Sequence, residues 1–353
     1  MSKSISSVDI GPEVLGDVRK QMQIDEEWLV SKPRKLTWWG HRLAQTIWAQ
    51  PAVVRMGMRI VSMQAETDLL VEVPDEPKTE QAIATLNATA ALNTIIWHRK
   101  DRRVGLRCST CIHPQVRWWL TKVFSSAVAM QVAEAENRVE LLRDMVGGKV
   151  AISGHPDSGK RREPDDMLNV LSLFTTKEND PSPFAGAEML SLCAFLEQHA
   201  LANGSQTGVT VEFPFPGAIP PTVLVRVLAD VSHPTYGAGV FLLMKLPSVP
   251  RNIKTGANLP NELNVAEIGQ IDAGHGFGSW CLDVEDLSPT AYVSFLPAAL
   301  FMPGLLQDLV ASLAVKAQWT HLWLDLGNNA AELEGWHELQ LRLLEWLARA
   351  AKP

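Results

Sequence analysis

The stretch TIIWHRKDRRVGLRCSTCIHPQVRWWLTKVFSSAVAMQVAEAENRVELLRDMVGG, residues 94–148, decides the fold class. It opens with two apolar segments, residues 94–97 and 104–111, on either side of a polar turn, which predicts an antiparallel hairpin. Pro114 then begins a long segment in which apolar residues recur every three or four positions, the spacing of one helix face. The pair Gly147 and Gly148 predicts the end of that helix. A hairpin followed by a helix that can pack against it favours an α+β fold.

The rest of the first half also carries helix and strand signals. Pro12 suits a first helical turn, and the apolar residues after it predict a helix over residues 11–31. Strands are predicted at residues 35–39, 46–48, 53–63 and 68–73, where β-rich segments are bounded by turn signals. Thr79 is the expected N-cap of a helix through residue 92. Residues 148–184 are dense in Gly, Pro, Ser and charge, which predicts a linker.

The second half repeats this order. Helices are predicted at residues 187–202, 259–268 and 305–319, with a last amphipathic helix at 332–349, and strands at 207–213, 223–231, 239–246, 279–284 and 292–296. Leu92-Asn93 matches Leu263-Asn264, and Cys108 matches Cys281 at nearly the same offset. We therefore predict two tandem modules with a pseudo-two-fold relation, residues 1–147 and 185–353, each an antiparallel sheet packed by helices, with residues 148–184 as linker.

Composition narrows the class of protein. The 353 residues are 46% hydrophobic and carry a net charge of −7, which suits sizeable cores and argues against salt-driven nucleic-acid binding. The start of the sequence has no apolar signal segment, and Pro297 and Pro303 interrupt the stretch nearest to a membrane span. We expect a cytoplasmic protein with reduced cysteines that binds neither membrane nor nucleic acid.

One segment has the spacing of a phosphate-binding loop. Gly154-His-Pro-Asp-Ser-Gly159-Lys160 fits G-x-x-x-x-G-K and follows a strand-like segment. However, Arg161 stands where such a loop has a Ser or Thr, and Pro164 with the paired acids is a poor helix start. A flexible linker is therefore favoured, and nucleotide binding at Lys160 is kept as the less favoured alternative.

No other pattern identifies a catalytic residue, a metal site or a cofactor. Cys108-x-x-Cys111-x-His113 has no second ligand pair, and two cysteines three residues apart on a strand face opposite ways. A buried Cys108 is favoured, and a redox role stays open because Pro114 begins a helix. The basic turn at residues 99–103 predicts a solvated hairpin tip, and the glycine-rich turn at residues 274–278 lacks the strand–loop–helix context of a dinucleotide site.

The order of elements resembles the type III secretion chaperone-like fold shared by YbjN-type proteins. The Leu-Asn pair before a hairpin, and Gly278-Ser-Trp-Cys281 followed by Tyr292-Val-Ser-Phe-Leu-Pro297, are similar to the tandem peptide-binding chaperones of that group (TY-Chap). The resemblance implies a curved sheet backed by helices, with an apolar strip that receives an extended polypeptide. It also implies a homodimer, or a monomer whose two halves form the dimer within one chain.

These observations predict a non-enzymatic, chaperone-like module that binds a polypeptide or protein client. The chain has 12 Trp residues, and neighbouring pairs on a strand cannot both face one core. The candidate peptide-binding residues are therefore Trp38, Trp39, Trp118 and Trp119. Two alternatives remain: an enzyme or nucleotide binder that uses Lys160, and a structural assembly subunit whose apolar strip is a permanent interface.

Overall fold

The computed structural model describes residues 9–55, 58–177, 180–197, 202–248, 259–282 and 290–325. The chain divides into two compact units, and each unit takes a short segment from the opposite half of the sequence. Unit 1 comprises residues 1–83, 93–172 and 267–271, and unit 2 comprises residues 84–92, 173–266 and 272–353. The predicted linker is thus shared out, because residues 148–172 fold with unit 1. The predicted helix at residues 332–349 lies outside the described residues.

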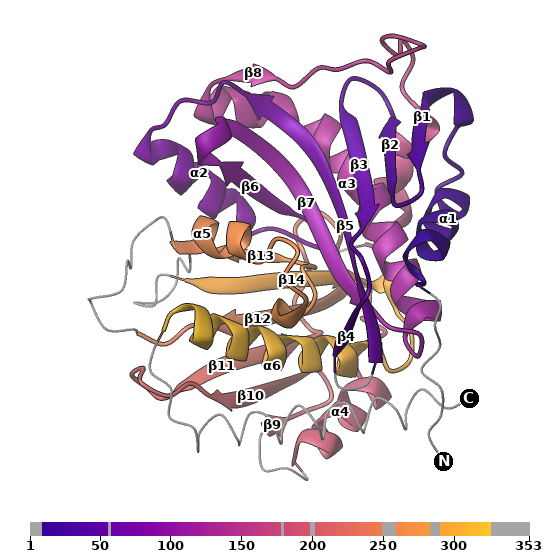
Figure 1. Cartoon of the computed structure of the whole chain (residues 1–353). Coiled ribbons are helices and arrows are strands. Elements are labelled where there is room, and N and C mark those ends of the chain that lie inside the picture. Colours follow the sequence, from indigo (N-terminus) through magenta and orange to yellow (C-terminus); the bar gives the residue numbers. More distant parts are fainter. Residues whose placement is uncertain are drawn as a thin grey trace. The chain divides into compact units, whose positions relative to one another are not determined.

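Unit 1 is built on an antiparallel sheet with the strand order β1-β2-β3-β5-β7-β6, to which β4 and β8 add short pairings with β5 (Figure 1). The long strand β5 sits between β3 and β7, where the sequence predicted two separate strands. The strands are β1 Leu29–Lys32, β2 Lys35–Trp39, β3 Ala44–Ala49, β4 Val53–Arg55, β5 Met58–Val71, β6 Thr94–His98, β7 Arg103–Ile112 and β8 Lys149–Val150.

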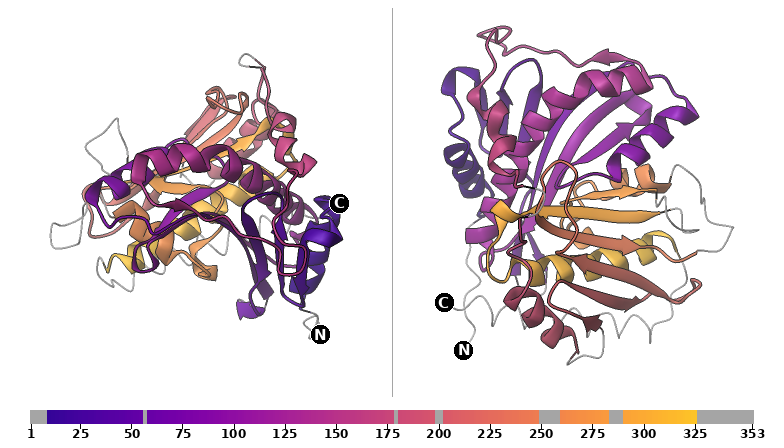
Figure 2. Two further views of the ribbon diagram at one scale, coloured as in Figure 1. Left: turned by 90° about the horizontal axis from the view of Figure 1, so that it is seen from above. Right: turned by 180° about the vertical axis from the view of Figure 1, so that it is seen from behind.

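Helix α3 (Arg117–Val146) covers one face of this sheet (Figure 2). The alternation in β3 shows the division of faces, because Gln45, Ile47 and Ala49 are buried while the residues between them are half-buried. Gln131 of α3 lies in this core and is hydrogen-bonded, with its Oε1 accepting from Gln45 and Thr67. The predicted hairpin and long helix are confirmed, and the helix ends at Val146, just before Gly147.

Two shorter helices complete the first half, α1 (Gly11–Gln21) and α2 (Pro77–Asn87). Helix α1 packs against α3, and it is ten residues shorter than the predicted helix at 11–31. The helix cannot continue because Gln23 has a positive φ of 50°, and Asp25 caps a new 3₁₀ turn by accepting from Glu27 N. That turn, η1 (Glu26–Trp28), leads directly into the edge strand β1.

Unit 2 has a second antiparallel sheet, with the order β13-β14-β12-β11-β10-β9. Helix α6 (Leu305–Trp323) runs along one face of it, as Figure 1 shows. The other elements are α4 Ala187–Glu197, β9 Ala202–Gly204, β10 Gly208–Pro214, β11 Thr222–Leu228, β12 Gly239–Lys245, α5 Leu259–Ala266, β13 Ser279–Cys281 and β14 Ala291–Pro297.

Strand β14 is buried along its whole length. On one side, Lys316 of α6 lies over the ring of Tyr292, with the ammonium 4.5 Å from the ring centroid. On the opposite side, Ala88 packs against Cys281, Ala291 and Val293. The segment 84–92, which comprises the last turn of α2 and the residues after it, therefore belongs to unit 2.

The two sheets have the same connectivity. Read from β9, the second sheet runs β9-β10-β11-β12-β14-β13, which matches β1-β2-β3-β5-β7-β6 strand for strand in chain order. The two sequence matches used to predict a duplication nevertheless fall on unlike elements. Cys108 lies in β7 but Cys281 lies in β13, the counterpart of β6, and Leu92-Asn93 precedes a strand while Leu263-Asn264 lies within α5. The two sheets therefore share their strand order, but these residue matches do not fall at equivalent places in it.

Candidate ligand-binding pocket on the first sheet

The face of the first sheet that points away from α3 carries a row of polar residues. Cross-strand pairing places Thr37 beside Thr46, Thr46 beside Glu66, and Glu66 beside Arg107. The two threonine hydroxyls lie 3.3 Å apart. Directly paired residues on one face of a sheet lie close enough to act together, so this row can form a continuous polar surface.

Glu66 is the centre of a charge cluster on this face. His98 Nε2 lies 3.1 Å from Glu66 Oε1, and Arg103 pairs with both Glu66 and Asp68. Burial alone would raise the pKa of the Glu66 carboxyl, but the hydrogen bond from His98 and the charges of Arg103 and Arg107 outweigh it and lower the pKa to about 2. Burial also lowers the pKa of Arg107 to about 10. Glu66 is therefore an ionised, fully engaged carboxylate and not a proton donor at neutral pH.

A cavity of about 420 Å³ opens beside this cluster. This volume lies in the range of small ligand sites. Half-buried Trp48 supplies aromatic surface, and the Arg107 guanidinium lies 5.8 Å from its ring centroid. The cavity is lined by Arg34, Lys35, Ala44, Thr46, Trp48, Glu66, Asp68 and Arg103.

The charged groups around the cavity differ in how far hydrogen bonds and ion pairs within the protein already occupy them. The Arg34 guanidinium pairs with Asp9 and donates to Ala49 O, so it is held by the protein itself. Lys35 is exposed and makes none of the hydrogen bonds or ion pairs found in the described part of the chain. Asp68 keeps 48% of its side-chain surface exposed although it pairs with Arg103. An incoming group would therefore meet a free ammonium, an accessible carboxylate and an indole ring.

Sequence reasoning missed this pocket. Its residues come from four strands that are far apart in the chain, so no local spacing reveals them. The available signal was polar alternation, since Gln64, Glu66 and Asp68 occupy every second position of one strand. The sequence pattern hides that signal because it predicts two separate strands, at residues 53–63 and 68–73, in place of the single strand β5.

The predicted tryptophan pair of β2 is buried on both sides of the sheet. Trp38 is 0% exposed, and Trp39, on the opposite face, is 7% exposed. The prediction that one of them is a surface aromatic is wrong because residues 153–165 cross the second face. Trp39 Nε1 donates to Ser153 Oγ at 3.0 Å, and its ring meets His155 edge-on at 5.2 Å between centroids.

The second pair lies on helix α3, where neighbouring side chains point about 100° apart. Trp119 is 7% exposed and belongs to the core, while Trp118 is 59% exposed. Lys122 lies over the Trp118 ring at 5.9 Å from its centroid. Of the four predicted binding residues, only Trp118 therefore offers surface to a partner.

The segment around Lys160 does not have the geometry of a phosphate-binding loop. His155 and Gly159 close a tight turn through two backbone hydrogen bonds of 2.8 and 2.9 Å. The N–H groups of Asp157 and Ser158 donate to His155 Nδ1 and so point away from any anion. No α-helix begins after Lys160, where such a loop needs a helix N-terminus; the next element is the 3₁₀ helix η3 (Asp166–Leu173). Lys160 does line an open cavity of about 850 Å³, shared with both basic and acidic residues.

The cysteine motif is divided between the two faces of β7. Cys108 faces α3 in the core, where Gln131 Nε2 donates to its sulfur at 3.6 Å, and burial raises the pKa of its thiol. Cys111 lies on the other face and donates to Ile271 O at 3.7 Å. The opposite-face prediction is confirmed. Within the described ranges, no group of three or more His, Cys, Asp or Glu residues could hold a metal ion.

The basic turn between β6 and β7 is a hairpin tip, as predicted. Its guanidinium groups are engaged within unit 1. Arg99 pairs with Asp75 and Glu80, and Arg102 donates to the carbonyl of Val73 at 3.1 Å. These contacts leave little free positive charge on the turn.

A buried polar cluster holds the glycine-rich turn of unit 2. His275 Nε2 lies 2.8 Å from Asp308 Oδ2, and His275 N donates to Ser312 Oγ at 2.7 Å. A side chain at Gly274 would collide with Ser312, which explains the glycine there. These contacts dock the glycine-rich turn on α6.

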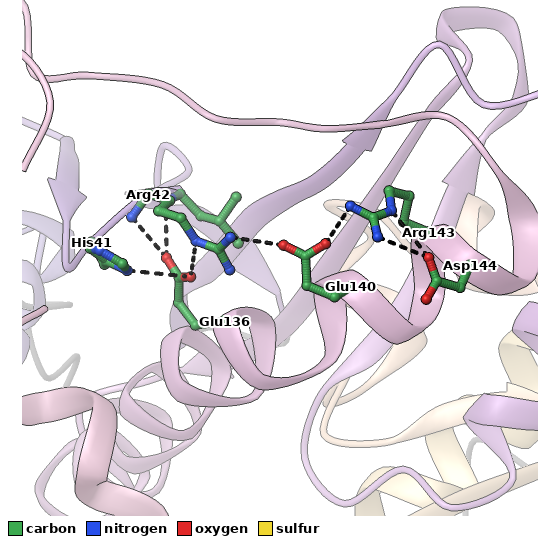
Figure 3. Close-up of polar contacts among 7 residues, drawn as sticks. His41, Arg42, Glu136, Glu140, Arg143 and Asp144 are labelled. Carbon is green, nitrogen blue, oxygen red and sulfur yellow. Dashed lines mark hydrogen bonds and ion pairs between the residues drawn. The ribbon is translucent and has the colours of Figure 1, made fainter.

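A chain of ionic contacts runs along α3 (Figure 3). Glu136 Oε1 accepts from the backbone N–H of Arg42 at 2.9 Å and of Leu43 at 3.2 Å, and its Oε2 pairs with the Arg42 guanidinium. The chain continues through Glu140 to Arg143. The buried end pins the β2–β3 turn to the helix, and the exposed end faces solvent.

Comparison with known proteins gives no relative: no family model, no curated protein and no solved structure matches the chain. The resemblance to the peptide-binding chaperones therefore stays a prediction. None of the described helices combines the length and hydropathy that crossing a bilayer requires.

Proposed function

We propose that the chain is a non-enzymatic binding protein that holds an extended, carboxylate-bearing polypeptide on the open face of the first sheet. The observation that carries the proposal is the Trp48 pocket. Its aromatic wall suits an apolar side chain, and the exposed Lys35 ammonium suits a neighbouring carboxylate. A polypeptide can supply both groups a few ångströms apart, and Asp68 can select a cationic residue farther along the same segment.

Three observations favour binding over catalysis. Glu66 is held ionised by His98 and Arg103, and the Cys108 thiol is kept protonated by burial. His275 is tied to Asp308 inside the second core. These three groups, which are the titratable side chains most easily cast as an acid, a nucleophile or a base, are thus held in contacts within the protein.

The proposal includes the finer architecture expected from the sequence, in which the two halves are tandem copies of one secretion-chaperone-like module. The identical strand order of the two sheets supports it. The copies have diverged at the site, because the pocket residues of the first sheet lie on β2, β3, β5 and β7, while the corresponding face of β12 carries Phe241 and Leu243.

The test is a binding titration with labelled 12-residue peptides of three kinds: acidic–apolar, basic–apolar and neutral. We expect the acidic–apolar peptides to bind the intact chain, and Trp48→Ala and Lys35→Glu each to weaken binding at least tenfold, or about 1.4 kcal/mol. Trp118→Ala is the matched control, since it removes a more exposed tryptophan from α3. Absence of binding by all three kinds, or equal affinity for the Trp48 variant and the intact chain, would refute the proposal.

A further inference from the structure

The residues that cross the second face of β2, 153–165, form a strap with an unusual closure at its tip. His155 Nδ1 accepts two backbone hydrogen bonds, from Asp157 N at 3.3 Å and from Ser158 N at 3.1 Å. An imidazole nitrogen that accepts hydrogen bonds carries no proton. The closed tip, residues 155–159, therefore requires the neutral form of His155.

The other ring nitrogen has no compensating partner. His155 is 7% exposed, and its Nε2 is buried without a hydrogen bond in the described part of the chain. The ring instead meets two indoles edge-on, Trp39 at 5.2 Å and Trp28 at 6.3 Å between centroids. A second proton would thus destroy both hydrogen bonds at Nδ1 and would gain no carboxylate.

The charges around the imidazole also oppose a second proton. Arg161 lies over the same Trp28 ring at 5.4 Å from its centroid, so a charged His155 would place two cations on one indole. The nearby carboxylates are engaged elsewhere, because Arg161 pairs with Asp165 at 2.9 Å and lies 3.9 Å from Asp25. Glu27 contributes its backbone carbonyl, which accepts from Ser158 Oγ at 3.1 Å. Asp157 contacts the imidazole through its backbone N–H. Trp39 is the contact from β2 and bears no charge.

We propose that His155 is a proton-sensitive catch: neutral, it holds the strap tip closed over Trp28 and Trp39, and protonated, it releases the tip. The remainder of the strap stays attached, since Ser153 N donates to Arg42 O at 3.0 Å and Asp165 N to Gly40 O at 2.9 Å. Release is therefore local, and it uncovers the edges of the two indoles next to the cavity that Lys160 lines.

The same turn geometry occurs once more in the described chain. His233 and Gly237 form an equivalent bridge, and His233 Nδ1 accepts from Thr235 N at 3.0 Å and Tyr236 N at 3.2 Å. There the ring is 2% exposed and its Nε2 lies 3.3 Å from Thr89 O. The His233 turn is built into a core, whereas the His155 turn lies on a strap that can open alone.

Amide hydrogen exchange on the full chain at pH 7.5 and 5.5, corrected for the intrinsic exchange rate, tests the catch. Because the closed tip admits only the neutral imidazole, closure should hold at pH 7.5, and opening of the tip should increase severalfold at pH 5.5. The expected result is lost protection at Asp157 and Ser158, with the His233 turn unchanged.

Two variants distinguish release of the strap tip by His155 from a loosening of the whole fold at low pH. His155→Asn keeps an acceptor at the δ position but does not titrate, so its strap should stay protected at both pH values. His155→Ala removes the acceptor and should leave the tip unprotected at both. Equal protection of the wild-type tip at both pH values would overturn the proposal. So would an unchanged pH response in His155→Asn, or parallel loss of protection at residues 232–238.

Discussion

At the scale of single residues, Glu66 is the side chain on which the polar face of the first sheet depends. Its mostly buried carboxylate is hydrogen-bonded to His98 and ion-paired with Arg103, and Arg107 lies beside it on the neighbouring strand. Removing one member of a buried charge cluster costs more than the cluster contributes, because the remaining charges are left without a counterion. The residue is therefore a structural support for the pocket rather than a contact for the client.

Glu66→Gln tests this role. The pKa falls from an ordinary 4.5 to about 2, so the ionised form stabilises the fold by about 3 kcal/mol. Because the pKa is depressed, this stability is present above pH 4.5 and is lost as the pH falls towards 2. Urea unfolding at pH 7 should show a loss of about this size, and the difference from wild type should shrink at pH 3. Glu13→Gln, whose carboxylate is half exposed, should cost under about 1 kcal/mol. A loss at pH 7 that persists unchanged at pH 3 would argue against the charge as its source.

The tryptophan pairs show where residue-scale prediction fails. Neighbouring residues of a strand point to opposite faces of the sheet, so the strand pattern correctly predicts that Trp38 and Trp39 lie on different faces. Whether the second face is open depends on residues 153–165, which are more than a hundred positions away and were predicted to be a linker. Burial of this kind is set by tertiary contact, which local spacing does not contain.

At the scale of elements, α3 is fixed to the sheet by a specific contact as well as by apolar packing. Glu136 lies where the β2–β3 turn has two backbone N–H groups without partners in the sheet ladder. Buried N–H groups need acceptors, and a carboxylate can serve both at once (Figure 3). The helix therefore sets the position of the turn that joins β2 to β3.

Glu136→Ala should destabilise the chain by about 2 kcal/mol, because it leaves these two N–H groups without an acceptor and removes one of the two carboxylates that pair with Arg42. Hydrogen exchange at residues 42–43 should accelerate more than exchange in β7. Arg143→Ala, at the exposed end of the same chain, is the control and should leave stability nearly unchanged because solvent screens its ion pairs. Equal losses for the two variants would show that the turn does not depend on Glu136.

Most elements were predictable because their signals are local. The helix at α3 and the hairpin of β6 and β7 follow from period and turn chemistry, and both were found at nearly the expected residues. The helix at residues 11–31 was predicted too long because its apolar spacing continues past Gln23, whose positive φ breaks it. The pocket was beyond reach, because it arises where four strands come together and because no strand carries a motif of its own.

At the scale of the whole molecule, the units do not coincide with the halves of the sequence. Residues 84–92 belong to unit 2, where Thr89 O lies 3.3 Å from His233 Nε2 and Ala91 O accepts from Phe295 N at 3.2 Å. Residues 267–271 belong to unit 1, where Ile271 O accepts from Cys111. Each half thus contributes a short segment to the other unit, so the boundary between the units is not a single point in the sequence.

Ala88→Glu tests this arrangement. The substitution places a carboxylate at a half-buried position against Cys281, Ala291 and Val293, and its partial desolvation should cost about 1 to 3 kcal/mol. Although residue 88 lies in the first half of the sequence, hydrogen exchange should accelerate in β14 and remain slow in β7. Thr85→Glu, one turn earlier and exposed, should leave both strands protected. If β7 lost protection instead of β14, residues 84–92 would belong energetically to the first sheet. The two halves would then be separate folding units, and a chain cut between them should yield two stable fragments rather than two incomplete ones.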